Sequence, residues 1–143
     1  MPTASNLQRF VDAQQKDYEI ALEEIKQGKK RSHWMWYIFP QIQGLGFSET
    51  SRYYAINDKE EATAYLKHPV LGTRLIQICH ALLQLPDKNA IHIFGYPDDL
   101  KLKSSLTLFS SLPDADPVFQ AVLNKFFNGK KDENTLQILA QQG

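Results

Sequence analysis

Helix start and stop signals divide this chain into short segments, and they limit its fold more than any other feature. Candidate caps stand at Ser5, Asp58, Asp116 and Asp132, and apolar residues follow each one at about helical spacing. Proline or glycine ends most of these segments. We therefore predict an all-α fold, a compact single domain over residues 1–143 with about six or seven helices and short connections.

The same signals predict individual helix boundaries. Ser5 is expected to cap a first helix that ends at Gly28, where a glycine can adopt a left-handed conformation. Asp58 with Glu61 three positions later predicts a capping box for a later helix. Pro69 is expected at the first position of the next helix, because that position needs no N–H donor.

Two segments have more than one interpretation. The stretch DKNAIHIFGYP could hold one helical turn or a short strand, and we expect Ile91 and Phe94 to be its apolar anchors. In DDLKLKSSLTLFSSL, the spacing of Leu102 and Leu106 favours a helix. The alternation of Leu100 and Leu102 keeps a strand as the alternative there.

The composition is typical of a soluble globular domain. Hydrophobic residues make up 43% and charged residues 22%, values that argue against extensive disorder. The formal net charge is zero, which weighs against a nucleic-acid partner. We see neither a secretory signal nor an apolar run that could span a membrane, so we expect a cytoplasmic protein.

The chemistry-bearing residue types show no metal or cofactor motif. The four histidines, His33, His68, His80 and His92, lack the spacing that places two ligands on one helix. Neither a dinucleotide-binding glycine loop nor a phosphate-binding loop of the GxxxxGK type is present. We therefore predict no metal and no cofactor. Cys79 falls on the apolar face of its helix, where we expect an inert core thiol.

The segment RSHWMWYIFPQI, residues 31–42, contains both tryptophans of the chain. Pro40 limits any helix here to two turns, so tertiary packing must support it. The tryptophans are expected to anchor the core, while convergent polar neighbours in aromatic surroundings are typical of small-molecule pockets. The candidate ligand-binding residues of this region are Arg31, Ser32, His33, Trp34, Trp36, Gln41, Gly44 and Gly46.

A second candidate is KLKSS at residues 101–105. In a helix, Lys101 would share a face with Ser105, and a lysine beside a hydroxyl can bind a phosphate or carboxylate. The alternative is a solvent-facing helix, but hydroxyl residues are less expected there because they compete for backbone hydrogen bonds. The candidate residues of this segment are Lys101, Lys103, Ser104, Ser105 and Thr107.

The blocks SHWMW, FPQ and GLG, with KLKSS and TLF, resemble the signature of the bacterial domain of unknown function 1810 family. The similarity extends from about Asn6 to Leu139 and begins with NLQRFVDAQ. It implies a compact all-helical single domain, and it assigns no activity or catalytic residue. Because the signature blocks coincide with the two candidate segments, we expect these segments to meet around one pocket.

Three functions are compatible with these residues. The first is binding of an anionic, nucleotide-like or ADP-ribose-like small molecule, with a tryptophan stacking on its ring and lysines holding its phosphate. If the chain is an enzyme, His33 is the expected acid or base, because the unperturbed pKa of a histidine side chain lies near neutrality. The alternative is a non-enzymatic protein-interaction module that uses the aromatic segment 32–48. A further alternative is single-stranded nucleic-acid binding, which zero net charge weakens.

Overall fold

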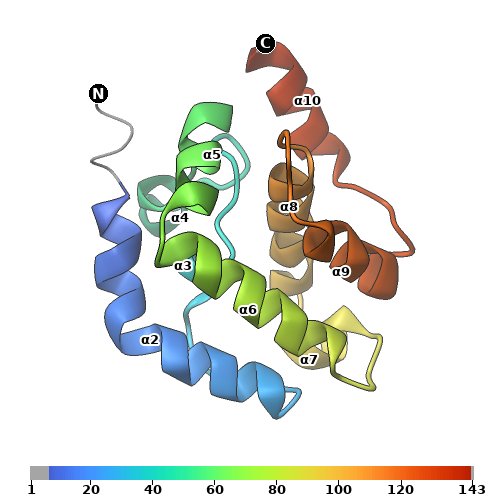
Figure 1. Ribbon diagram of the computed structural model, residues 1–143. Helices are drawn as coiled ribbons and strands as arrows, with labels where there is room; N and C mark the ends of the chain where they lie inside the picture. Colours follow the sequence, from blue (N-terminus) through green and yellow to red (C-terminus); the bar gives the residue numbers. More distant parts are fainter. Residues whose placement is uncertain (1–6, 143) are drawn as a thin grey trace.

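The structure is a computed structural model that describes residues 7–142 (Figure 1). Within this range it contains nine helices and no strand, which confirms the predicted all-α fold. Six helices have nine residues or more, and three have five or fewer. The helices are α2 (Gln8–Lys26), α3 (Met35–Ile38), α4 (Glu49–Tyr53), α5 (Lys59–Lys67), α6 (Leu71–Leu83), α7 (Ala90–Phe94), α8 (Asp98–Ser110), α9 (Pro117–Phe127) and α10 (Glu133–Gln142).

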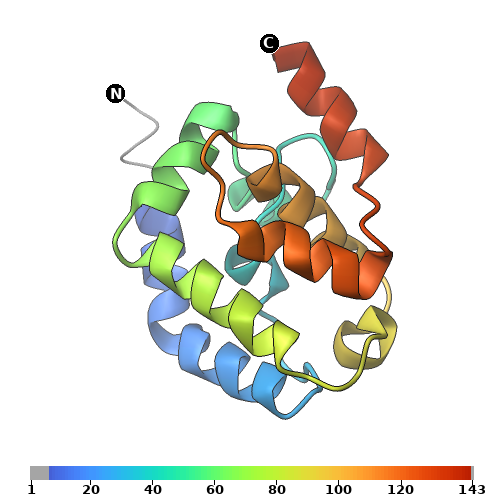
Figure 2. The same ribbon diagram turned by 45° about the vertical axis from the view of Figure 1, so that its right-hand side comes forward.

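Helix α8 is the central element of the fold. It packs against α5, α7, α9 and α10, and Leu102, Leu106 and Leu108 on different sides of it are fully buried. Residues 104–109 of this helix are buried on every side, as expected where other helices surround it. Helix α6 crosses the molecule between α2 and α9 in Figure 1, and Figure 2 shows α9 in front of α8. The buried hydrophobic side chains of these helices form one connected core.

The predicted short aromatic helix is α3, and tertiary contacts support it as expected. Trp34 is 1% exposed, and its ring lies 6.3 Å from that of Phe94. The side-chain amide of Gln14, on α2, donates a hydrogen bond of 2.7 Å to the carbonyl of Tyr37. A four-residue helix is unstable alone, so these contacts with α2 and α7 hold it in place.

Most predicted helix boundaries are confirmed. The side chains of Asp58, Asp116 and Asp132 each accept a hydrogen bond from a backbone N–H in the first turn of the following helix. Gly28 has a φ of +80°, and its N–H closes the end of α2 on a carbonyl of the last turn. The predicted cap at Ser5 lies outside the described residues.

The expected start of α6 at Pro69 is wrong by two residues. The helix begins at Leu71 instead. His68 accounts for the shift, because its Nδ1 atom accepts hydrogen bonds from the N–H groups of Val70, at 3.1 Å, and Leu71, at 3.3 Å. A histidine side chain thus caps the helix from outside, a role that the sequence signals did not indicate.

The two ambiguous segments are both helical. Within DKNAIHIFGYP, α7 is a single helical turn in which Phe94 is buried, as predicted, but Ile91 is 53% exposed. Ile93 takes the core position expected for Ile91, so the predicted anchor was wrong. The strand alternative for residues 98–112 is also wrong, since α8 occupies most of that range.

Cys79 is a core residue, as predicted. It is fully buried on α6 beside Leu75, Ile78 and Leu82, and burial raises the pKa of its thiol far above the ordinary value. The thiolate is therefore suppressed at neutral pH. No helix among residues 7–142 has the length and apolar character needed to cross a membrane.

Candidate functional site

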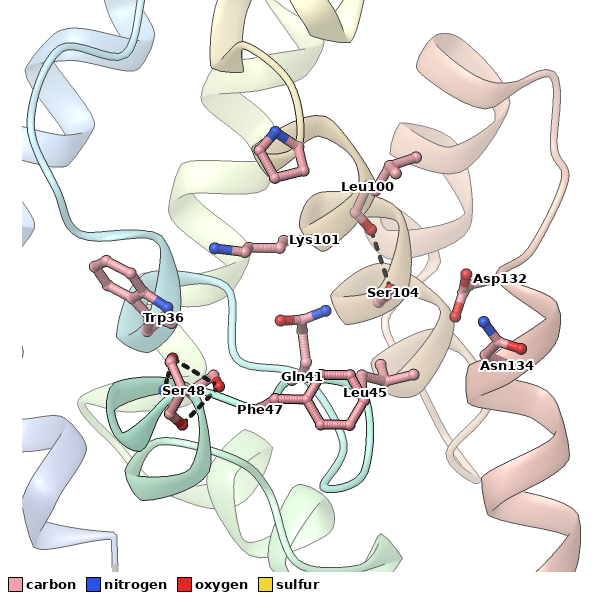
Figure 3. A pocket seen from close by; sticks show the side chains of 13 residues that line it. Trp36, Gln41, Leu45, Phe47, Ser48, Leu100, Lys101, Ser104, Asp132 and Asn134 are labelled. Carbon is pink, nitrogen blue, oxygen red and sulfur yellow. Dashed lines mark hydrogen bonds between the residues drawn. The ribbon is translucent and has the colours of Figure 1, made fainter.

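A cavity of about 480 Å³ lies where three parts of the chain meet: residues 36–51, the first half of α8 and the start of α10. Figure 3 shows Trp36 and Ser48 on one side of it and Asp132 and Asn134 on the other, with the amide of Gln41 between them. The two segments expected to meet around one pocket therefore share this one. The lining residues are Trp36, Gln41, Leu45, Gly46, Phe47, Ser48, Ser51, Pro97, Leu100, Lys101, Ser104, Asp132 and Asn134.

Lys101 provides the positive charge of the cavity. Its ammonium group lies over the ring of Trp36, 4.9 Å from the centroid, and 3.3 Å from a carboxylate oxygen of Asp98. The other oxygen of Asp98 forms an ion pair with the ammonium of Lys30, at 3.0 Å. Two ammonium groups thus share one carboxylate at this wall, and the carboxylate of Asp132 lies at the opposite wall.

An exposed apolar rim borders the cavity. Phe47 is 81% exposed and Tyr96 is 75% exposed, the two highest values among the large hydrophobic residues of the described range. Phe47 lines the cavity, as does the half-exposed Leu100, and Tyr96 directly precedes the lining residue Pro97. Figure 3 shows the ring of Phe47 at the lower edge of the cavity, next to Leu45. Exposed apolar groups gathered at one place are typical of binding sites.

The cavity brings together five of the thirteen residues predicted from the sequence: Trp36, Gln41, Gly46, Lys101 and Ser104. Eight others do not line it: Arg31, Ser32, His33, Trp34, Gly44, Lys103, Ser105 and Thr107.

Glu24 explains the position of three of these eight residues. Its carboxylate accepts hydrogen bonds from the N–H groups of Arg31 (2.8 Å) and Ser32 (3.0 Å), the hydroxyl of Ser32 (2.6 Å) and the indole N–H of Trp34 (2.9 Å). Burial disfavours the carboxylate and is the largest single influence, but these hydrogen bonds together outweigh it and lower the pKa of Glu24 to about 2. The polar groups expected to bind an external anion thus surround an internal one. His33, in the same loop, is exposed.

Helix geometry separates the residues of KLKSS. Lys103 is two positions after Lys101, about 200° around the helix, so its ammonium points away and lies over the ring of Phe127 at 6.0 Å. Thr107 donates a hydrogen bond to the carbonyl of Lys103 and accepts one of 2.9 Å from the N–H of Asp132. By accepting this bond, Thr107 fixes the start of α10 at the edge of the cavity. Ser105 is fully buried, and no described residue is a hydrogen-bond partner of its hydroxyl.

The family model described as "protein of unknown function (DUF1810)" matches residues 4–139. The chain belongs to this family. It is also similar to the crystal structure of Rv1873, a conserved hypothetical protein of Mycobacterium tuberculosis. The two chains are 46% identical with a TM-score of 0.92, over 94% of this chain and 96% of the other. A search of curated proteins gives no match.

Several lining residues were not predicted as site residues. Phe47 could have been recognised from the sequence. It directly follows the glycine loop, and the residues three and four positions before and after it are not large apolar residues. Asp132 was expected only as a helix cap, and it has that role. Nothing in the sequence indicated Asn134, because its position depends on how α10 docks against α8.

The titratable groups of the lining are Lys101 and Asp132, and one oxygen of Asp132 already accepts two hydrogen bonds from Thr135. Within residues 7–142, no three histidine, cysteine, aspartate or glutamate side chains are close enough to hold a metal ion. The cavity therefore offers aromatic faces, amide and hydroxyl groups, one ammonium and one carboxylate.

Proposed function

We propose that this protein binds a small molecule that carries a planar aromatic group and an anionic group, as nucleotide-like compounds do. The observation that carries the proposal is the position of Lys101. Its ammonium lies over Trp36 at the cavity wall, next to an almost fully exposed Phe47. Aromatic faces and a cation at one cavity complement the two parts of such a ligand.

Each part of the cavity has a separate role in this proposal. The ring of the ligand covers Phe47, which removes apolar surface from water. The anionic group contacts Lys101, whose carboxylate partner Asp98 is shared with Lys30, at the wall opposite Asp132. The amides of Gln41 and Asn134 are placed to fix the orientation of the ligand by hydrogen bonds. A volume of about 480 Å³ falls within the usual range for small-molecule sites.

The proposal covers binding and assigns no reaction. His33, the expected acid or base, is exposed and does not line the cavity. Asp132 already caps α10 and accepts hydrogen bonds from Thr135.

Fluorescence titration with AMP and ADP-ribose tests the proposal, because Trp36 lies at the cavity and Trp34 is buried. We expect saturable quenching by both nucleotides and weaker binding of adenosine, which lacks the phosphate. Thermal unfolding in the same solutions should shift upward as the site fills, by RT ln(1 + [L]/Kd). Failure of both nucleotides to change fluorescence or unfolding would overturn this proposal.

Paired variants locate the binding site. Lys101→Gln should weaken nucleotide binding by about tenfold or more, since a charge-assisted contact is lost. Lys103→Gln, on the same helix but the opposite face, should leave it unchanged. Phe47→Ala should also weaken binding, whereas Tyr53→Ala, another exposed aromatic outside the cavity, should not. Equal effects of the two lysine variants would indicate nonspecific electrostatic binding instead.

A protein-interaction role is the second candidate, and the exposed Phe47 and Leu100 at the cavity favour it. Aromatic residues are enriched at protein interfaces, and such a rim would lose its exposure in a complex. The test is affinity capture with the wild type and with Phe47→Ser, using Tyr53→Ser as the control. A partner retained by all three proteins would contradict docking at this rim.

A further inference from the structure

A second cavity, of about 320 Å³, lies between α7, the beginning of α8 and the end of α9. Asp99, Ile91, Phe126 and Phe127 contribute to its wall. Asp99 is two positions before Lys101, about 200° around the helix. This cavity and the cavity at Lys101 therefore lie on opposite faces of α8. The two sites share no lining residue.

The carboxylate of Asp99 is the unusual group in this cavity. The residue is only 6% exposed, and its Oδ1 atom is buried without a hydrogen-bond partner among the described residues. The preceding residue, Asp98, is a direct contrast, because both of its oxygens pair with lysines. A buried carboxylate is costly unless a cation or hydrogen-bond donor compensates it.

The lysines near Asp99 are engaged elsewhere. Lys103 is one turn later on the same face, but its ammonium lies over Phe127 and forms no ion pair with Asp99. The ammonium of Lys125 donates hydrogen bonds to carbonyls at the end of α6, at 2.9 Å to Leu82 and 3.2 Å to Leu83. Lys88, at the cavity edge, is exposed and can keep its charge in water.

We propose that this cavity binds a small primary alkylammonium ion. The ammonium donates a hydrogen bond to the carboxylate of Asp99, and the hydrocarbon chain lies against Phe127 and Ile91. Two observations carry this assignment: the buried carboxylate of Asp99 with an unpaired oxygen, and the two phenylalanine rings in the same cavity. Lysine ammonium groups lie 6.0 Å from the ring centroid of Phe127 and 5.1 Å from that of Phe126, and they compete with the ligand for these rings.

The test is a titration of the ¹⁵N-labelled protein with n-butylammonium chloride, followed by amide chemical shifts at constant ionic strength. We expect saturable changes at Ile91, Asp99 and Phe127 and none at Gln41 or Gly46, which belong to the first cavity. n-Butanol lacks the charge, and tetramethylammonium lacks an N–H donor. Both should bind at least about tenfold more weakly. Absence of saturable changes with n-butylammonium, or equal changes with n-butanol, would overturn the proposal.

Adjacent aspartates provide a matched pair of variants. Asp99→Asn should weaken n-butylammonium binding by about tenfold or more, whereas Asp98→Asn should leave it nearly unchanged. Both residues lie in the first turn of α8, so the effect on the helix dipole is similar in the two variants. Wild-type affinity in Asp99→Asn would refute the site.

Two further variants keep the proposal testable if Asp99→Asn does not fold. Phe127→Leu keeps an apolar wall but removes the aromatic face, so it should weaken binding of the cation more than binding of n-butanol. Lys103→Gln removes a competing ammonium, so it should leave the affinity unchanged or raise it. Loss of binding in Lys103→Gln, or no effect of Phe127→Leu, would contradict the proposed geometry.

Discussion

Replacement of Glu24 by glutamine should destabilise the fold at neutral pH by about 3 kcal/mol. The carboxylate accepts four hydrogen bonds from the 31–34 loop, three of them on one oxygen. Glutamine keeps that oxygen but not the charge, so these bonds lose their charge assistance. The lowering of the pKa of Glu24 from 4.5 to about 2 gives the same magnitude, since one unit corresponds to about 1.4 kcal/mol.

The dependence on pH follows from the direction of this shift. The pKa of Glu24 is lower in the folded chain than in the unfolded one, so its stabilisation is complete above about pH 4.5. It is lost as the pH falls through the interval from about 4.5 to about 2. The stability of the wild type should therefore approach that of Glu24→Gln in this interval.

Urea unfolding followed by circular dichroism measures both effects. Glu23→Gln is the matched control, because Glu23 precedes Glu24 on α2 but is exposed, and it should change stability by no more than about 0.5 kcal/mol. Glu24→Ala should cost somewhat more than Glu24→Gln, because it leaves the indole N–H of Trp34 without an acceptor. The reasoning is refuted if Glu24→Gln and Glu23→Gln unfold at the same urea concentration at pH 7.

Three other substitutions probe packing and caps. Gly72→Ala should destabilise the fold by about 2 kcal/mol or more, because a Cβ there would meet the carbonyl oxygen of Leu66 at 2.0 Å. The higher helix propensity of alanine does not offset this clash. Thermal unfolding measures the effect, and a stabilised variant would contradict it. Lys125→Met should lower the free energy of unfolding in urea by about 1–3 kcal/mol, because the Lys125 ammonium binds the carbonyls that end α6. Lys130→Met, at an exposed position, is the control and should be nearly neutral. Thr107→Val should lower the free energy of unfolding by about 1–2 kcal/mol, since the N–H of Asp132 loses its acceptor. Amide hydrogen exchange should accelerate in α10 more than in α2. Equal acceleration in both helices would argue against a local effect.

Local signals were sufficient for most of the fold. Caps such as Asp58 and Asp116 act within one helical turn, so sequence spacing reveals them directly. Ile91 was misassigned because a single helical turn has too few residues to define an apolar face. The side-chain cap by His68 was missed because histidine is not among the usual N-cap residues.

The candidate site was only partly predictable for a different reason. Arg31 and Ser32 were predicted to contact an external ligand, but their backbone N–H groups and the Ser32 hydroxyl bind the carboxylate of Glu24 on the preceding helix. Nothing in the sequence distinguishes an internal carboxylate from an external one. Lys101 and Lys103 could have been separated in advance, because residues two positions apart cannot share one face of a helix.

The cavity at Lys101 takes one wall from α10, and that helix is only lightly anchored. Thr135 and Leu139 are its buried residues in the described part of the chain, Ile138 packs against the core, and single hydrogen bonds to Thr107 and from Gln142 to Asn57 hold its two ends. A complete cavity therefore exists only in molecules whose C-terminal helix is docked. The measured affinity of any ligand there equals its intrinsic affinity multiplied by the docked fraction, and the ligand in turn pulls the helix onto the body. Substitutions in α10 far from the cavity can thus tune binding without touching the ligand.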